Sequence, residues 1–192
     1  MKAVGIGDIH GRNNWMMITE LVDRVDKVVF IGDYTDSFHV SNVEILHNLK
    51  QIIEFKKKHG DKVELLLGNH DLQYISLFGS AFRCSGYRAE MKHDLEYLFR
   101  ENIDLFKLCY KKDNFIFTHA GITNNWMKFA KNFLQRFDLL DDFSNIDVCL
   151  NNILHTSSNW ILSTVGEKRG GLRYDYGSPI WADRSEMVGD AI

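Results

Sequence analysis

Three short apolar runs near the start of the chain are each followed by a glycine and then by a polar residue of a type that binds metal ions. The three runs, each with that polar residue, are residues 2–6 with Asp8, 27–31 with Asp33 and 63–67 with Asn69. Short apolar runs that end at glycine predict buried strands of a parallel sheet. Because the carboxyl ends of parallel strands meet at one edge of the sheet, we expect the three polar side chains to converge there.

The segments around these strands predict an α/β fold. Residues 12–25, 43–58 and 90–102 have the apolar spacing of helices with one buried face. Residues 106–110 and 114–118 predict two strands of a hairpin, joined through Lys111, Lys112 and Asp113. Further helices are expected over residues 124–137 and 139–154, and an irregular excursion over residues 72–88. With 192 residues, 45% of them hydrophobic, the chain is expected to form one domain over residues 1–192.

Composition excludes several classes of partner. The formal net charge of −3 gives no reason to expect binding to nucleic acid or to an anionic membrane, and no apolar run is long enough to cross a bilayer. Cys84, Cys109 and Cys149 are odd in number and far apart, so free thiols in a reducing compartment are expected rather than a disulfide framework. We therefore expect a cytoplasmic protein.

Four clusters contain the residue types that bind divalent metal ions. They are Asp8-Ile9-His10-Gly11, Gly32-Asp33-Tyr34-Thr35-Asp36, Gly68-Asn69-His70-Asp71 and Thr118-His119-Ala120-Gly121. Carboxylate, amide and imidazole ligands suit a pair of divalent cations that keep open positions for water and substrate. We expect Asp8 and His10 to bind a first metal, Asp33 to bridge both metals, and Asn69 and His119 to bind the second. Two such metals share a hydroxide that can attack phosphorus in line with the leaving oxygen.

His70 is predicted to act differently from the residues beside it. We expect it to protonate the leaving oxygen as a general acid, with Asp36 accepting its other ring N–H and raising its pKa. Each cluster alone is a weak pattern, but four in order, after predicted strands, favour a catalytic site over chance.

Together the four clusters resemble the signature of the calcineurin-like metallophosphoesterase superfamily. The similarity is greatest to its phosphoprotein-phosphatase branch, which includes small phage and bacterial Ser/Thr phosphatases, and to the diadenosine tetraphosphatases. The segment from Ser178 to Arg184 also resembles a late tryptophan-containing segment of that branch, so the resemblance extends from residue 7 to about residue 184. It implies two mixed β-sheets packed as a sandwich and flanked by helices, short at the C-terminus. It also implies the metal ligands given above, which are Asp8, His10, Asp33, Asn69 and His119. His70 with Asp36 would be the acid pair.

The chain departs from the branch at two places. Asp36 is followed by Ser37 and Phe38 where the branch has Arg-Gly. The arginine that contacts phosphate in the branch is therefore missing here. The chain also ends at Ile192 before a late Gly-His-Thr motif that supplies a ligand of the second metal. Truncation is the favoured explanation; the alternatives are completion by another polypeptide, or substitution by another histidine such as His39 or His155. An edge left open at the C-terminus favours self-association or a completing partner.

The resemblance implies a phosphate-ester hydrolase with two divalent metal ions, Mn²⁺ first, and Fe, Zn, Ni or Mg as alternatives. A Ser/Thr protein phosphatase acting on a phosphorylated protein, or on a small phosphate ester, is the first expectation. Cleavage of a dinucleotide polyphosphate or phosphodiester is the alternative, and a catalytically impaired metal-binding or interaction protein is a third. Arg184 is a candidate phosphate contact by resemblance. Arg12, which follows the first cluster, either lies on the surface or contacts phosphate.

Overall fold

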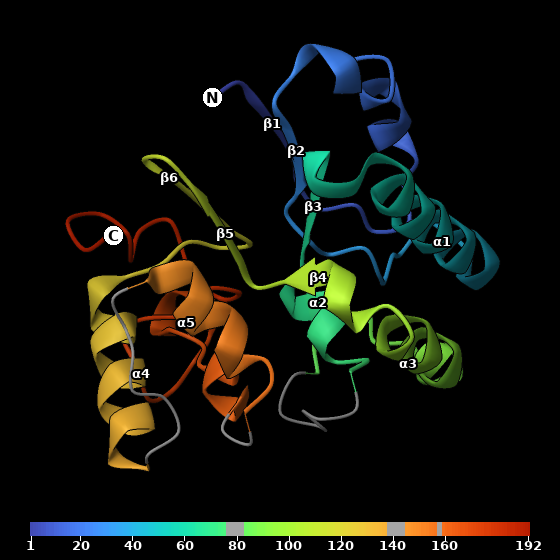
Figure 1. Ribbon diagram of the computed structural model, residues 1–192. Coiled ribbons are helices and arrows are strands. Elements are labelled where there is room, and N and C mark those ends of the chain that lie inside the picture. Colours follow the sequence, from blue (N-terminus) through green and yellow to red (C-terminus); the bar gives the residue numbers. More distant parts are fainter. Residues whose placement is uncertain (76–82, 138–144, 157–158) are drawn as a thin grey trace. The chain divides into compact units, whose positions relative to one another are not determined.

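The chain folds into two compact units, residues 1–107 and 108–192, in a computed structural model (Figure 1). The structure describes residues 1–75, 83–137, 145–156 and 159–192. The prediction of one domain over residues 1–192 stays a prediction.

The first unit is built on a four-stranded parallel sheet. Its strands lie in the order of the sequence: β1 (Ala3–Ile6), β2 (Lys27–Phe30), β3 (Val63–Leu66) and β4 (Phe106–Lys107). Val28, Val29 and Phe30 of β2 are completely buried, as is Leu65 of β3. The three strands predicted from the apolar runs are confirmed, and their carboxyl ends lie at one edge of this sheet.

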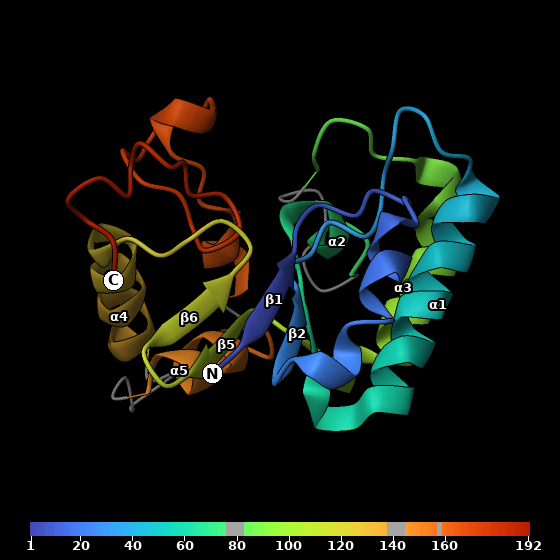
Figure 2. The ribbon, with the colours of Figure 1, turned by 90° about the horizontal axis from the view of Figure 1, so that it is seen from above.

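Two helices lie side by side on one face of this sheet, α1 (Asn42–His59) and α3 (Lys92–Arg100) (Figures 1 and 2). Helix α1 begins at a capping box, in which the Ser41 hydroxyl accepts from Glu44 N–H and the Glu44 carboxylate accepts from Ser41 N–H. Such a cap satisfies backbone N–H groups that have no partner within the helix. Sequence and structure agree on both helices. A third, α2 (Asn69–Leu72), is a single turn directly after β3.

The helix predicted over residues 12–25 is wrong. This segment forms two short 3₁₀ turns, Asn14–Ile18 and Val22–Arg24, that bury Trp15 and Val22. Neither turn has a side-chain cap, and asparagine and β-branched residues disfavour an α-helix. The apolar side chains are buried as the spacing predicted, but without the continuous backbone hydrogen bonds of a helix.

The single strand predicted over residues 106–110 is also wrong. It is divided between the two units: Phe106 and Lys107 form β4, whereas β5 (Cys109–Lys112) pairs antiparallel with β6 (Phe115–Thr118) in the second unit. The hairpin turn is Asp113-Asn114, in which Asp113 has φ +53°. Aspartate and asparagine tolerate this left-handed backbone, so the turn lies one residue later than predicted.

In the second unit, one helix packs against this hairpin. Helix α5 (Ile146–Ile153) is joined to β5 by Asn151, whose amide oxygen accepts from the N–H groups of Leu108 and Cys109 and whose nitrogen donates to the Cys109 carbonyl. Helix α4 (Asn124–Arg136) begins at Thr123, whose hydroxyl accepts from Trp126 N–H. The start predicted for α5 falls partly on residues 138–144, outside the described residues. With a parallel sheet, an antiparallel sheet and flanking helices, the predicted α/β class is confirmed.

Short 3₁₀ turns connect many of these elements. In the described part they include residues 60–62, 89–91, 103–105, 159–163 and 167–169. Within the same residues, every helix is too short or too polar to span a lipid bilayer.

Candidate active site

The loops that follow β1, β2 and β3 bring the predicted polar residues of the first unit together. Asp8 and Asp33 offer carboxylate oxygens within 4.8 Å of one another, and so do ligand atoms of His10, Asp33 and His70. His10 Nε2 lies 3.7 Å from Asp33 Oδ2. Asp33 is therefore the residue common to both groups, which is the position expected of a bridging ligand.

Backbone carbonyls fix the ring of His10. Its Nδ1 lies 2.9 Å from the carbonyl oxygen of Thr35 and 3.2 Å from that of Asp36. Carbonyl oxygens only accept hydrogen bonds, so Nδ1 carries the proton and Nε2 presents a lone pair toward Asp33. A histidine held in this way is prepared to bind a metal through Nε2.

A buried carboxylate, Asp71, joins the second and third loops. Its Oδ2 accepts from the N–H groups of Asp33 at 2.8 Å and Gly68 at 2.9 Å, and its Oδ1 accepts from those of Tyr34 at 2.9 Å and Thr35 at 3.2 Å. Burial and the charge of Asp33 raise the pKa of Asp71 above its ordinary value, and they outweigh the N–H groups of Gly68, Thr35 and Tyr34, which act to lower it. Asp71 therefore sets the positions of the loops that carry the candidate metal-binding side chains.

The backbone at the site is strained at three residues that are not glycine. His10, Asp33 and Asp36 have φ values of +45°, +55° and +56°. Such conformations cost free energy and occur where the surrounding structure enforces them, often at functional sites. The loops are also closely packed, since a Cβ atom added at Gly68 would lie 2.1 Å from Asp33 Oδ1. Glycine is therefore required there, and a side chain would displace Asp33.

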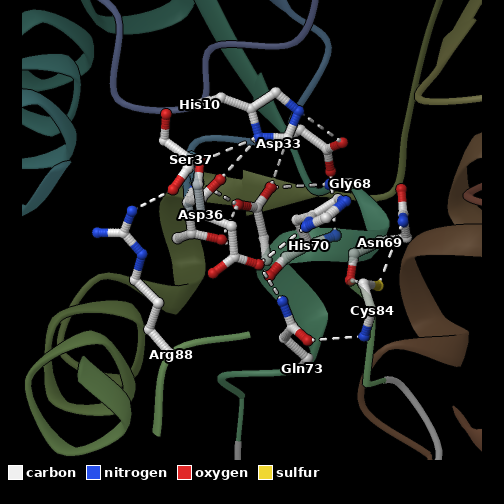
Figure 3. Close-up of polar contacts among 12 residues, drawn as sticks. His10, Asp33, Asp36, Ser37, Gly68, Asn69, His70, Gln73, Cys84 and Arg88 are labelled. Atoms are coloured by element: carbon white, nitrogen blue, oxygen red, sulfur yellow. Dashed lines mark hydrogen bonds and ion pairs between the residues drawn. The ribbon is translucent and has the colours of Figure 1, made fainter. Parts of the chain in front are cut away.

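His70 and Asp36 form the contact predicted from their spacing. His70 Nδ1 lies 2.8 Å from Asp36 Oδ2, and Figure 3 shows Asp36 between His70 and Gln73. Asp36 also accepts from the Gln73 amide and the Tyr74 hydroxyl, and it is only 2% exposed. Burial lowers the pKa of His70, but the hydrogen bond to Asp36 and the charge of Asp33 outweigh it, so the pKa is raised. The protonated ring that a general acid needs is thus stabilised.

Residues 84–88, with no motif in the sequence, hold these side chains in place. The Cys84 N–H donates to the Gln73 amide oxygen at 2.9 Å, and its sulfur lies 3.3 Å from the Asn69 amide nitrogen. The Arg88 N–H donates to the Tyr74 hydroxyl at 2.8 Å, and its guanidinium reaches the backbone of the Asp36 loop at the Ser37 carbonyl (Figure 3). These contacts are long-range and leave no local pattern, which is why the sequence did not predict them.

A small pocket opens beside this pair. It has a volume of about 170 Å³ and is lined by His10, His70 and Asp36, with Arg12 and His39 among the other lining residues. We call it the catalytic pocket. Arg12 donates to the carbonyls of Asp8 at 2.9 Å and Ile9 at 3.3 Å, so it supports the first loop as well as lining the pocket.

The remaining predicted residues, His119 and Arg184, belong to the second unit. His119 follows β6 and is half-buried, and the N–H of the next residue, Ala120, donates to the Pro179 carbonyl at 2.8 Å. The fourth cluster and the tryptophan-containing segment are thus in contact within that unit. Arg184 is exposed. The roles of both residues stay predictions.

Comparison with known proteins identifies the family. The profile of the calcineurin-like phosphoesterase family matches residues 1–185, which is nearly the whole chain. The chain belongs to the calcineurin-like phosphoesterase family. This phosphoesterase is 32% identical over 134 residues to the symmetrical bis(5'-nucleosyl)-tetraphosphatase of Buchnera aphidicola subsp. Baizongia pistaciae, a match covering 66% of this chain and 46% of the relative. The chain therefore aligns with about half the length of that relative.

The fold is also similar to that of a solved structure, a cold-active protein tyrosine phosphatase. That similarity has a TM-score of 0.48 and 17% identity, and it covers 95% of this phosphoesterase and 55% of the other chain. A similarity of this strength assigns neither the activity nor the substrate.

Family membership implies divalent metal ions, and the donor set fits them. Asp8, His10 and Asp33 combine two carboxylates with an imidazole whose Nε2 lone pair is oriented by carbonyl contacts at Nδ1. Hard and borderline divalent cations accept this mixture. His39 lines the catalytic pocket but belongs to none of the groups of metal-binding side chains found in the described residues.

Proposed function

We propose that this phosphoesterase hydrolyses phosphate monoesters at the carboxyl edge of the parallel sheet, using two divalent metal ions, Mn²⁺ first. The contact between His70 Nδ1 and Asp36 at 2.8 Å, beside the candidate metal ligands, carries the proposal. Asp8, His10 and Asp33 would hold one metal. Asp33 and Asn69, with His119 from the sequence motif, would hold the other. Bound metals would supply Lewis-acid stabilisation of phosphoryl charge and lower the pKa of water.

The protein's own contribution to the reaction is a proton delivered to the leaving oxygen. His70 holds its Nδ1 proton against Asp36, so Nε2 is the atom that donates. Water forms a new bond to phosphorus while the bond to the leaving oxygen breaks. That oxygen takes the proton of His70, and the proton lost by water restores the acid. The products are an alcohol and inorganic phosphate.

Positive charge in the catalytic pocket would orient the ester. Arg12 lines this pocket, and its Nη2 donates to the Asp8 carbonyl while its Nε donates to the Ile9 carbonyl. An anchored guanidinium binds phosphate with little loss of side-chain freedom. We propose that Arg12 takes the place of the arginine that is missing after Asp36. Arg184 remains a second proposed contact, supported by the sequence motif alone.

Hydrolysis of p-nitrophenyl phosphate by the Mn²⁺-loaded protein tests the proposal. The wild type should turn over, Asp8→Ala should bind less metal and lose activity, and His70→Ala should lose activity at unchanged metal content. His93→Ala, an exposed histidine on α3, is the matched control and should keep both. A His70→Ala variant as active as the wild type on both p-nitrophenyl and phenyl phosphate would exclude the proposed acid.

Cleavage of a dinucleotide polyphosphate is the second candidate. Its support is the similarity to a bis(5'-nucleosyl)-tetraphosphatase. The substrate in the cell is proposed to be a phosphoprotein or a small phosphate ester, and the metal chemistry is common to all of these.

An interaction protein without turnover is the third candidate, and a complete absence of hydrolysis with any of the metals would favour it.

A further inference from the structure

A second, larger pocket shares one lining residue, Arg12, with the catalytic pocket. It has a volume of about 470 Å³ and lies between residues 11–14 and one face of α1. Arg12 lines both pockets. We call this one the loop–helix pocket. A phosphate ester in contact with Arg12 has its phosphorus on one side and room for a larger group on the other.

The two volumes indicate different occupants. The catalytic pocket of about 170 Å³ accepts little more than a phosphoryl group, whereas pockets for organic ligands range from roughly 300 to 1,000 Å³. The loop–helix pocket falls within that range. A substrate that fills both therefore carries an organic group much larger than its phosphate.

The lining favours a neutral ligand that forms hydrogen bonds. Arg12 and Glu44 contribute opposite charges, and the His47 imidazole contributes one further polar ring. The amides of Asn13, Asn14 and Gln51 contribute both donors and acceptors. Side-chain amides form paired hydrogen bonds with the edges of nucleobases. A second phosphate would find no excess of positive charge in this pocket.

An apolar wall and a rigid floor complete the pocket. Val40 and Val43 supply an apolar surface on one side. Asn48 fixes the floor, because its amide nitrogen donates to the Gly11 carbonyl at 2.7 Å and its oxygen accepts from Trp15 Nε1 at 2.8 Å. The loop is thus held against α1 before a ligand arrives, which lowers the entropic cost of binding.

We propose that the loop–helix pocket binds the nucleoside of a nucleoside phosphate whose phosphoryl group occupies the catalytic pocket. The amides would contact the base edge, the valines its face and Glu44 the ribose hydroxyls. The proposal rests on the proposed function for the phosphoryl group. The pocket itself can be tested without turnover.

Direct binding of adenosine, which has no phosphate, tests the pocket in the Mn²⁺-loaded protein. Equilibrium dialysis should show adenosine bound to the wild type and lost in Val43→Trp, which fills the pocket from an exposed position. Lys58→Trp adds the same side chain to an exposed position of α1 outside the pocket and should retain binding. Absence of adenosine binding to the wild type, or equal binding by Val43→Trp, would overturn the proposal.

Kinetics separate this proposal from the proposed function. KM for adenosine 5'-monophosphate should be about tenfold lower than for ribose 5-phosphate, the gain expected from one or two hydrogen bonds and a covered ring, and Val43→Trp should remove the difference. Equal KM values would overturn the nucleoside site while the phosphatase stands. Adenosine binding without any hydrolysis would overturn the phosphatase while the nucleoside site stands. A Val43→Trp effect on a phosphoserine peptide, but not on the nucleotide, would assign the pocket to peptide and overturn our assignment.

Discussion

Single buried side chains determine how the acid pair is held. Asp36 accepts hydrogen bonds from three residues, His70, Gln73 and Tyr74, and has almost no exposure to water. Burial and the hydrogen bond to Asp36 raise the pKa of Tyr74, so its hydroxyl stays a donor over the working pH range. We therefore propose Tyr74 as a positioning residue for the acid, since it does not belong to the lining of the catalytic pocket.

Replacing Tyr74 by Phe should weaken the acid more than the metal site. We expect kcat for phenyl phosphate, which has a poor leaving group, to fall about tenfold, part of the 10²–10⁴-fold that general acids supply. With p-nitrophenyl phosphate, whose leaving group needs less protonation, the fall should be smaller, and KM and metal content should stay unchanged. Tyr87→Phe, at a ring stacked 5.2 Å from that of Tyr74, is the control. Equal losses with both substrates would contradict the positioning role.

Replacing Asp71 by Asn should loosen the metal ligands. The amide nitrogen cannot accept from the N–H groups that the carboxylate now holds, and unpaired buried donors cost about 1–3 kcal/mol each. Loss of such support around ligands typically lowers metal affinity by about 10–100-fold. Metal titration followed by urea unfolding measures both effects, with Asp104→Asn as an exposed control. Unchanged metal affinity would show that the loops hold their positions without Asp71.

At the scale of residues, the sequence predicted which candidate side chains lie together but not which residues hold them in place. The closeness of Asp33 to Asp8 and to His10 was predictable, because metal-binding residue types follow strands whose ends must meet. Gln73, Tyr74 and Arg88 were not, because their partners lie more than 10 residues away and their residue types are common on any surface.

At the scale of elements, apolar periodicity predicted burial better than backbone conformation. Residues 12–25 bury Trp15 as expected, yet they form 3₁₀ turns, because nothing caps a helix there. The strand expected over residues 106–110 divides because two sheets each take part of it, which periodicity cannot show. Capped α1 was predictable throughout, since its spacing and its end signals agree.

A charge cluster links the elements of the first unit away from the site. Glu64 of β3 is 3% exposed and contacts Lys27 of β2 at 3.0 Å and Lys107 of β4 at 2.9 Å, with Lys56 of α1 at 3.8 Å. Burial acts to raise the pKa of Glu64, but hydrogen bonds from Lys107 and Lys27 outweigh it and lower the pKa. The carboxylate thus stabilises three strands and a helix together.

Replacing Glu64 by Gln should destabilise the protein by about 3–5 kcal/mol, the usual cost of removing one partner of a buried ion pair. The pKa is lowered on folding, so the contribution is fully present above the unfolded pKa of about 4.3 and is lost as pH falls through the lower folded value. Urea unfolding at pH 7 and below pH 4 should therefore show a gap between variant and wild type that narrows in acid. Glu54→Gln, in an exposed pair, is the control. A gap that does not depend on pH would contradict the charge argument.

At the scale of the whole molecule, the residues that the sequence motifs propose as metal ligands are spread over most of the chain. Asp8, His10, Asp33 and Asn69 belong to residues 1–107, and His119 to residues 108–192. The family profile covers both units, which is consistent with one functional molecule. A metal that binds the folded protein but not the unfolded chain stabilises the fold.

Replacing His119 by Ala should therefore change metal content and unfolding together. We expect the Mn²⁺ content to fall from about two ions to one, since the second metal loses its imidazole while the first keeps Asp8, His10 and Asp33. Metal loading should raise the unfolding temperature of the wild type more than that of the variant, because binding adds about 2.7 kcal/mol at a hundredfold excess over Kd. His155→Ala is the matched histidine variant from the same unit. It also tests whether His155 replaces the missing ligand of the second metal or has no part in metal binding. Two ions in His119→Ala and one in His155→Ala would reassign the second site to His155. Two ions in both variants would show that neither histidine is a metal ligand.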